Sequence, residues 1–172
     1  MRKLILIAFL VGISITFANA AALPGWFIKS FNNQKLNQHY LIVNNAKPTF
    51  LEADFNGDSK NDVAVQLTDI KTKKKGILII NFGQNKFYVF GAGVKFANEG
   101  FDNTNWINGW KINRDKTVYE TMFKPNGDII GGRKITIKYP AISAYMLEDE
   151  VETPVILIYW NGLKYESIHQ GD

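Results

Sequence analysis

The sequence predicts a mainly β protein, a single antiparallel β domain built of hairpins. Short apolar segments rich in isoleucine and valine recur along the chain, as in Gly76–Phe82 and Pro154–Trp160. Segments of this length with β-branched residues are typical of strands. Asn-Gly pairs at 126–127 and 161–162 readily take the positive φ angles of tight hairpin turns. No segment has the apolar period of a long helix, and no composition shift marks a second domain.

The first residues have the pattern of an export signal, so residues 1–20 are expected to be a signal peptide. Two basic residues, an apolar run over 4–17 and the sequence Ala-Asn-Ala at 18–20 follow one another. The run is shorter than the ~20 residues of a membrane span, which makes a retained anchor the weaker alternative. Cleavage after Ala20 leaves one β-rich domain over 21–172, periplasmic or secreted and without a transmembrane segment. The chain has no cysteine, which excludes an acylated lipoprotein.

The segments before residue 70 predict three strands. Ala21–Asn33 mixes aromatic and polar residues and is expected to be an irregular lead-in, with a short helical turn near Ser30–Leu36. His39–Val43 is apolar and β-branched, which predicts a first strand. Thr49–Ala53 is expected to enter an acidic loop, and Asp62–Leu67, which alternates in period 2, is expected to leave it.

A hairpin of two further strands is expected next. Gly76–Phe82 is a nearly continuous apolar run, which favours a buried central strand. Gly83-Gln84-Asn85 turns the chain into a partner strand over Lys86–Phe90. The chain's basic cluster lies between strands and is expected at a solvated hairpin tip, with an anion- or membrane-contacting patch as the alternative; it consists of Lys71, Lys73, Lys74 and Lys75.

The segment Gly91–Gly109, here called the long loop, has a different composition. It combines several glycines and asparagines with Phe96, Phe101 and Trp106. Loops of this length are often functional, so we expect a ligand surface here, with Trp106 exposed on it.

The second half of the chain predicts a series of hairpin strands. The segment 133–139 alternates isoleucine with lysine and threonine, which indicates a half-exposed strand. Pro154–Trp160 is the most apolar segment after residue 20 and is followed by an Asn-Gly turn into a last strand. The expected strands are Trp110–Asn113, Thr117–Phe123, Arg133–Tyr139, Ile142–Leu147, Pro154–Trp160 and Leu163–Ile168.

The sharpest chemical signal is the segment Asp54–Asp62, here called the acidic loop. Side-chain oxygens stand at its positions 1, 3, 5 and 9, and position 7 offers a backbone carbonyl. Ca²⁺ takes 6–8 oxygen ligands, and a tight loop of alternating aspartate and asparagine supplies most of them. Because the carboxylates of such a loop repel one another, folding and Ca²⁺ binding are expected to be linked. The candidate ligands are Asp54, Asn56, Asp58, the carbonyl of Lys60, and Asp62.

This motif resembles a known calcium loop. Asp54-x-Asn56-Gly57-Asp58-x-x-x-Asp62 followed by Val63-Ala64-Val65 is similar to the loop of FG-GAP repeats of the integrin α or VCBS type. In that family the loop joins two strands of a β-propeller blade and holds Ca²⁺. The closing sequence, from Leu157-Ile158-Tyr159-Trp160-Asn161-Gly162 to Gln170-Gly171-Asp172, is similar to that of small exported bacterial proteins of unknown function. Neither resemblance implies an activity.

The chain departs from the family pattern in two ways. Ser59 stands where the loop usually has glycine, and a left-handed conformation there costs roughly 1–2 kcal/mol. One loop is present, whereas a propeller needs at least four blades, so the domain is expected to be related to a blade without being a full propeller. Position 12 is Val65, which excludes an EF-hand. The alternative is an Asx-rich turn that holds no metal.

Several function classes are disfavoured. The formal net charge is +4, and loss of the signal's two basic residues leaves +2, too small a surplus to indicate nucleic-acid binding. His39 and His169 are the only histidines and do not have zinc-site spacing. No nucleophile elbow, Ser-x-x-Lys motif or phosphate-binding glycine loop is present.

The leading hypothesis is therefore an exported, Ca²⁺-binding and non-enzymatic β domain that presents the long loop to a protein or a glycan. A small secreted hydrolase using Glu99 and Asp102, and a purely structural envelope protein, are the alternatives.

Overall fold

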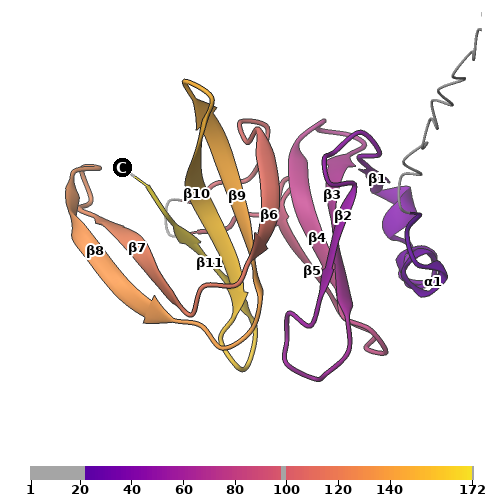
Figure 1. Ribbon diagram of the computed structural model, residues 1–172. Coiled ribbons are helices and arrows are strands. Elements are labelled where there is room, and N and C mark those ends of the chain that lie inside the picture. The colour runs from indigo at the N-terminus through magenta and orange to yellow at the C-terminus, as the bar shows by residue number, and fades with distance from the viewer. Residues whose placement is uncertain (1–21, 98–99, 172) are drawn as a thin grey trace, which may run out of the picture.

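The computed structural model describes residues 22–97 and 100–171, so the expected signal peptide lies outside the described residues. Over these described residues the fold is mainly β, with antiparallel sheets and no full propeller. Helix α1, a first sheet, a second sheet and a separate hairpin follow one another across the molecule (Figure 1). The elements are α1 (Gly25–Asn33), the 3-10 turn η1 (Leu36–Gln38), β1 (Tyr40–Ile42), β2 (Phe50–Ala53), β3 (Asp62–Asp69), β4 (Lys75–Ile80), β5 (Phe87–Gly91), β6 (Gly109–Asn113), β7 (Thr117–Phe123), β8 (Ile129–Thr136), β9 (Ala141–Glu148), β10 (Val151–Trp160) and β11 (Tyr165–His169).

The first sheet is built around β3. Strand β3 pairs with β4 on one side, β5 continues beyond β4, and β1 and β2 share the other edge of β3. The expected β4–β5 hairpin is confirmed, and the lysine cluster lies at the turn between β3 and β4, as predicted. Strands β3 and β4 are buried on both faces, because each face of this sheet is covered by another layer.

The second sheet has the order β11-β10-β9-β6 and packs against the first. Alternate residues of the two sheets, including Ile79, Ile142 and Ile158, form the core between them. Trp110 is 1% exposed within this core, and its Nε1 donates a hydrogen bond to the carbonyl of Pro48 at 2.9 Å. This hydrogen bond links β6 of the second sheet to the segment just before β2, the strand that enters the acidic loop.

The lead-in predicted to be irregular is helix α1, and that prediction is wrong. Phe27 and Phe31 are four residues apart, so they lie on one face of the helix, and they are 0% and 5% exposed. They pack with Val65 and Leu78 on the outer face of the first sheet. The helix has only nine residues and no side-chain N-cap, so tertiary packing stabilises it rather than local propensity.

The hairpin β7–β8 covers the outer face of the second sheet. Val118 and Ile137 from this region pack against Leu157 and Ile168 of the second sheet. Strand β8 begins at Ile129 rather than at the predicted Arg133, and its register shifts opposite Met122 and Phe123.

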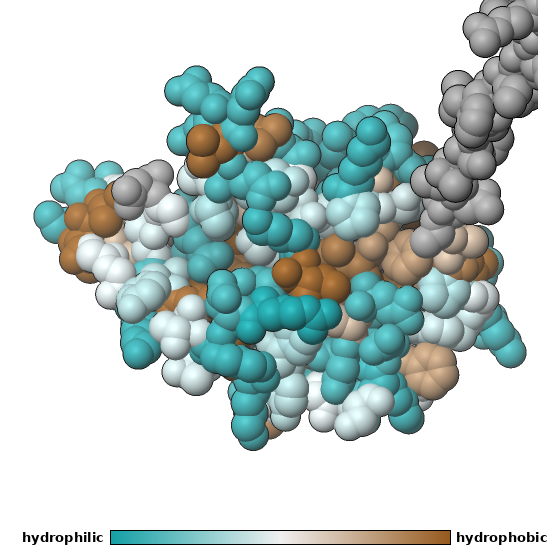
Figure 2. Space-filling view, viewed as in Figure 1, coloured by the Kyte–Doolittle hydropathy of each residue, from teal (hydrophilic) through white to brown (hydrophobic). Residues whose placement is uncertain are grey.

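Hydrophobic residues at the tips of two hairpins are exposed. Figure 2 shows brown surface at the ends of β7–β8 and β9–β10, where Ile129, Ile130, Leu147 and Val151 are about half exposed or more. Within the described residues no helix is long and apolar enough to cross a membrane.

Candidate functional site

The acidic loop joins β2 to β3, and its first carboxylate organises the backbone. Asp54 Oδ1 accepts hydrogen bonds from the N–H groups of Gly57 at 2.6 Å and Asp58 at 3.0 Å. Its Oδ2 accepts one from the N–H of Ser59 at 2.9 Å. Aspartate side chains favour such turns because they can bond to backbone groups a few residues ahead. Asp54 therefore winds the loop into a tight coil.

Two further side chains continue this coil. Asn56 Oδ1 accepts the N–H of Asp58 at 3.0 Å, and Asp58 Oδ1 accepts the N–H of Lys60 at 3.0 Å. The amide Nε2 of Gln84, from the β4–β5 turn, donates to Asp58 Oδ2 at 3.3 Å. The loop is thus tied to the neighbouring hairpin as well as to itself.

Asp62 ends the acidic loop, and its carboxylate is 0% exposed. It accepts the N–H of Phe55 at 3.1 Å and the N–H of Phe82 at 3.0 Å. Burial raises the pKa of Asp62 to about 6, and the charge of Asp58 adds to this, against the lowering effect of the backbone N–H groups. Asp62 therefore joins the loop to the end of β4 at an electrostatic cost.

Ser59 has φ 66° and Gly57 has φ 81°, so both take left-handed conformations. A Cβ on Gly57 would stand 2.1 Å from the ring of Tyr139, which adds a steric reason for glycine there. A serine in the left-handed conformation costs roughly 1–2 kcal/mol, so Ser59 is a strained position.

A buried polar cluster beside Asp62 was not foreseen from the sequence. The hydroxyl of Tyr165 lies 2.9 Å from Asn81 Oδ1, to which it donates, and 3.5 Å from Asp62 Oδ2. Burial raises the pKa of Tyr165, and the charge of Asp62 raises it further. The Tyr165 ring is held edge-on between those of Tyr88 and Trp160. Tyr165 comes from β11, 103 residues from Asp62, so no local pattern relates the two.

The five candidate ligands are thus on one short loop, but their carboxylates face different partners. Asp54 and Asp58 hold backbone N–H groups, and Asp62 faces the core. Within the described ranges no three or more His, Cys, Asp or Glu side chains are grouped to hold a metal ion. The donor types nevertheless suit Ca²⁺, since each carboxylate has about four lone-pair sites and the hydrogen bonds use only some of them. Asn56 and Lys60 add uncharged oxygens to the set.

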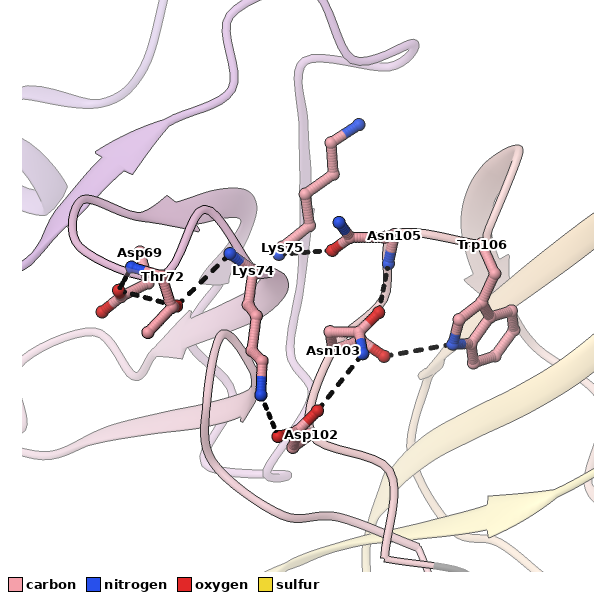
Figure 3. A network of polar contacts seen from close by, with 8 residues as sticks. All are labelled: Asp69, Thr72, Lys74, Lys75, Asp102, Asn103, Asn105 and Trp106. Carbon is pink, nitrogen blue, oxygen red and sulfur yellow. Dashed lines mark hydrogen bonds and ion pairs between the residues drawn. The ribbon is translucent and has the colours of Figure 1, made fainter.

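The long loop is fixed to the β3–β4 turn by a network of polar contacts (Figure 3). Lys74 forms an ion pair with Asp102, and the N–H of Lys75 donates to Asn105 Oδ1 at 2.7 Å. Trp106 Nε1 donates to the carbonyl of Asn103 at 3.1 Å. The lysines at this turn therefore act partly as anchors for the loop.

The aromatic residues of the long loop face the interior. Phe96 is 6% exposed and belongs to the core between the sheets. Trp106, which the sequence predicts to be exposed, is half-buried against that core, so this prediction is wrong. The loop presents mainly backbone and polar groups.

The positions of Glu99 and Asp102 add no support for the hydrolase alternative. Glu99 lies outside the described residues. The hydrogen bond and charge of Lys74 lower the pKa of Asp102, whereas a general acid needs a pKa raised towards the working pH.

Comparisons with known proteins give no further guidance: no family model, no curated protein and no solved structure matches the chain.

Proposed function

We propose that this chain is an exported Ca²⁺-binding β domain that acts as a non-enzymatic binding module in the periplasm or outside the cell. The observation that carries the proposal is the acidic loop, which concentrates five oxygen donors in nine residues. Through hydrogen bonds it also meets the end of β4 and the β4–β5 turn. An ion bound there acts on several strands at once.

The residues that would hold the ion are Asp54, Asn56, Asp58, the carbonyl of Lys60, and Asp62. A divalent cation converts the mutual repulsion of the three carboxylates into attraction, which offsets the burial of Asp62. Extracellular modules bind Ca²⁺ at roughly 10⁻⁴–10⁻³ M. At about 1 mM Ca²⁺ and a Kd near 0.1 mM, binding adds about 1.4 kcal/mol to the free energy of unfolding.

The ligand of the module is proposed to be a protein or a glycan that contacts the long loop. Supporting this, the loop is held at both ends by hydrogen bonds, among them the N–H of Gly93 to the carbonyl of Asp102 at 2.7 Å and the N–H of Thr104 to the carbonyl of Lys75 at 2.9 Å. A loop fixed before binding loses little conformational entropy when a ligand arrives.

Thermal unfolding of the chain from residue 21 onward tests the calcium proposal. Millimolar Ca²⁺ is expected to raise Tm by about 3–6 °C over the value in chelator, since about 1 kcal/mol shifts a domain of this size by 2–4 °C. Asp58→Asn keeps the shape of an exposed side chain but removes its charge, and should abolish most of the shift.

Asp115→Asn is the matched control, because Asp115 is also exposed and lies outside the acidic loop. Equal Tm values with Ca²⁺ and with chelator, or an undiminished shift in Asp58→Asn, would contradict the calcium proposal.

A further inference from the structure

A polar cavity of about 430 Å³ lies where the long loop meets the last strands. Its volume is within the range of small-molecule sites, roughly 300–1,000 Å³. The charged and hydroxyl-bearing residues of its lining come from the long loop, β7, β8, β10, β11 and the turn between β10 and β11. They are Lys95, Glu120, Arg133, Tyr159, Lys164, Tyr165, Glu166 and Ser167. Segments this far apart in sequence converge on one space.

Inner and outer groups of the cavity differ in charge. Glu120 is 2% and Tyr159 8% exposed, so a carboxylate and a hydroxyl belong to the buried part of the lining. The exposed basic side chains of Lys95, Arg133 and Lys164 lie towards solvent. A ligand in the cavity therefore meets exposed positive charge beside the partly exposed carboxylate of Glu166.

The carboxylates already have cationic partners. Glu120 Oε2 accepts Arg133 Nε at 2.8 Å and lies 2.5 Å from the second guanidinium nitrogen. Glu166 accepts the Tyr159 hydroxyl at 3.1 Å, and its other oxygen is 3.6 Å from Lys164 Nζ. The side chain of Lys95 forms no ion pair among the described residues. Its charge contributes to the lowered pKa of Asp102, but the ion pair of Asp102 is with Lys74.

Among the described lining residues, these pairings leave a surplus of one positive charge, together with unused acceptor sites on Glu166. Ser167 Oγ accepts the N–H of Ala97 at 2.8 Å, which fixes the long loop against β11 and leaves the serine hydroxyl able to donate. The cavity is thus built to accept one anionic group and several hydroxyl groups together.

We propose that this cavity binds a uronic-acid unit of an acidic glycan. The ligand carboxylate is held by Lys95, the lining cation without an ion pair, and ligand hydroxyls donate to the unused acceptor sites of Glu166. A phosphoryl group carries more negative charge than a carboxylate, so Glu120 and Glu166 repel it more strongly. It also adds no hydrogen-bond donor for these acceptors. An amino acid brings an ammonium group that competes with the cations already on those carboxylates. A neutral sugar leaves the positive surplus unmatched.

This inference deepens the binding role proposed above and does not depend on the calcium site, because no cavity residue belongs to the acidic loop. The experiment titrates the ¹⁵N-labelled chain from residue 21 onward, in Ca²⁺ and again in chelator, with digalacturonic acid, galactobiose and galactose 6-phosphate. Digalacturonic acid is expected to shift the amides of residues 95–97 and 164–168 saturably, with an affinity that falls as ionic strength rises.

Lys95→Gln should weaken digalacturonic acid binding about threefold to tenfold, the usual range for one exposed charged hydrogen bond. Lys29→Gln, which removes the same charge from exposed α1, should leave the affinity unchanged. Equal binding of galactobiose, tighter binding of galactose 6-phosphate, shifts outside these residues, or unaltered affinity in Lys95→Gln would each overturn the proposal. Loss of the Tm response to Ca²⁺ with these shifts intact would refute the calcium site alone.

Discussion

Replacing Tyr165 by phenylalanine removes one oxygen atom but should destabilise the protein, because a buried hydrogen bond to Asn81 is lost. Tyr165 is 7% exposed and donates a hydrogen bond to Asn81, which is itself 1% exposed. The variant keeps the ring and its contacts with Tyr88 and Trp160, so packing changes little. It leaves Asn81 Oδ1 buried without its hydroxyl donor, in a side chain whose Nδ2 already has no partner among the described residues.

A buried acceptor without a partner costs about 1–3 kcal/mol, so we expect the free energy of unfolding of Tyr165→Phe to fall by that amount. Urea unfolding measures this, and an unchanged m-value shows that the native and unfolded states bury the same surface as before. Tyr119→Phe is the matched control, because Tyr119 is 60% exposed and should change by less than about 0.5 kcal/mol.

A double-mutant cycle separates the hydrogen bond from other effects. Asn81→Leu replaces the acceptor by an apolar group of similar shape, so Tyr165→Phe should cost little in that background, giving a coupling of about 0.5–3 kcal/mol. If Tyr165→Phe costs no more than Tyr119→Phe, or the cycle shows no coupling, the inferred role of this buried cluster is refuted.

Two other predictions concern the helix and the long loop. Phe27→Ala should lower the free energy of unfolding by about 3–5 kcal/mol, because Phe27 is 0% exposed between α1 and the first sheet. Ile28→Ala, at a position 37% exposed on the same helix, should cost much less in the same urea assay, and similar costs would contradict the docked helix. Lys74 lowers the pKa of Asp102 below 3.8, so this pair stabilises the folded state above that pH and ceases to do so as pH falls through the lowered value. The stability difference between the native chain and Asp102→Asn should therefore shrink between neutral pH and about pH 3, and a difference independent of pH would refute it.

The strands were predictable because their signals are local. The apolar run of β4 and the Asn-Gly turn between β10 and β11 depend on neighbouring residues only, and the structure has both. Helix α1 was missed because its stability comes from burying Phe27 and Phe31 against strands that follow it in the chain. The start of β8 was misplaced because Ile129 and Ile130 are exposed in a hairpin that has one packed face.

The candidate site was predictable only in part, for a similar reason. Oxygen-bearing side chains at fixed spacing indicate Asp54, Asp58 and Asp62 as candidate Ca²⁺ ligands from the sequence alone. The partners of Asp62 depend on how β4 and β11 are brought together, and nothing near Asn81 or Tyr165 signals this. The polar cavity could not be predicted from the sequence either, because its charged residues come together only after both sheets and the β7–β8 hairpin have packed.

The arrangement of that hairpin has a consequence for cooperativity. Strands β7 and β8 pair with each other and contact the remaining structure through an apolar face and a few hydrogen bonds, such as Thr121 Oγ1 to the carbonyl of Gly171 at 2.6 Å. The hairpin can therefore detach while both sheets stay intact. Amide hydrogen exchange along β8 then reports this partial opening instead of global unfolding. Since Glu120 and Arg133 lie on the same hairpin, detachment also dismantles one wall of the polar cavity. By mass action, any occupant of the cavity slows exchange in β8 and leaves exchange in β3 and β4 nearly unchanged.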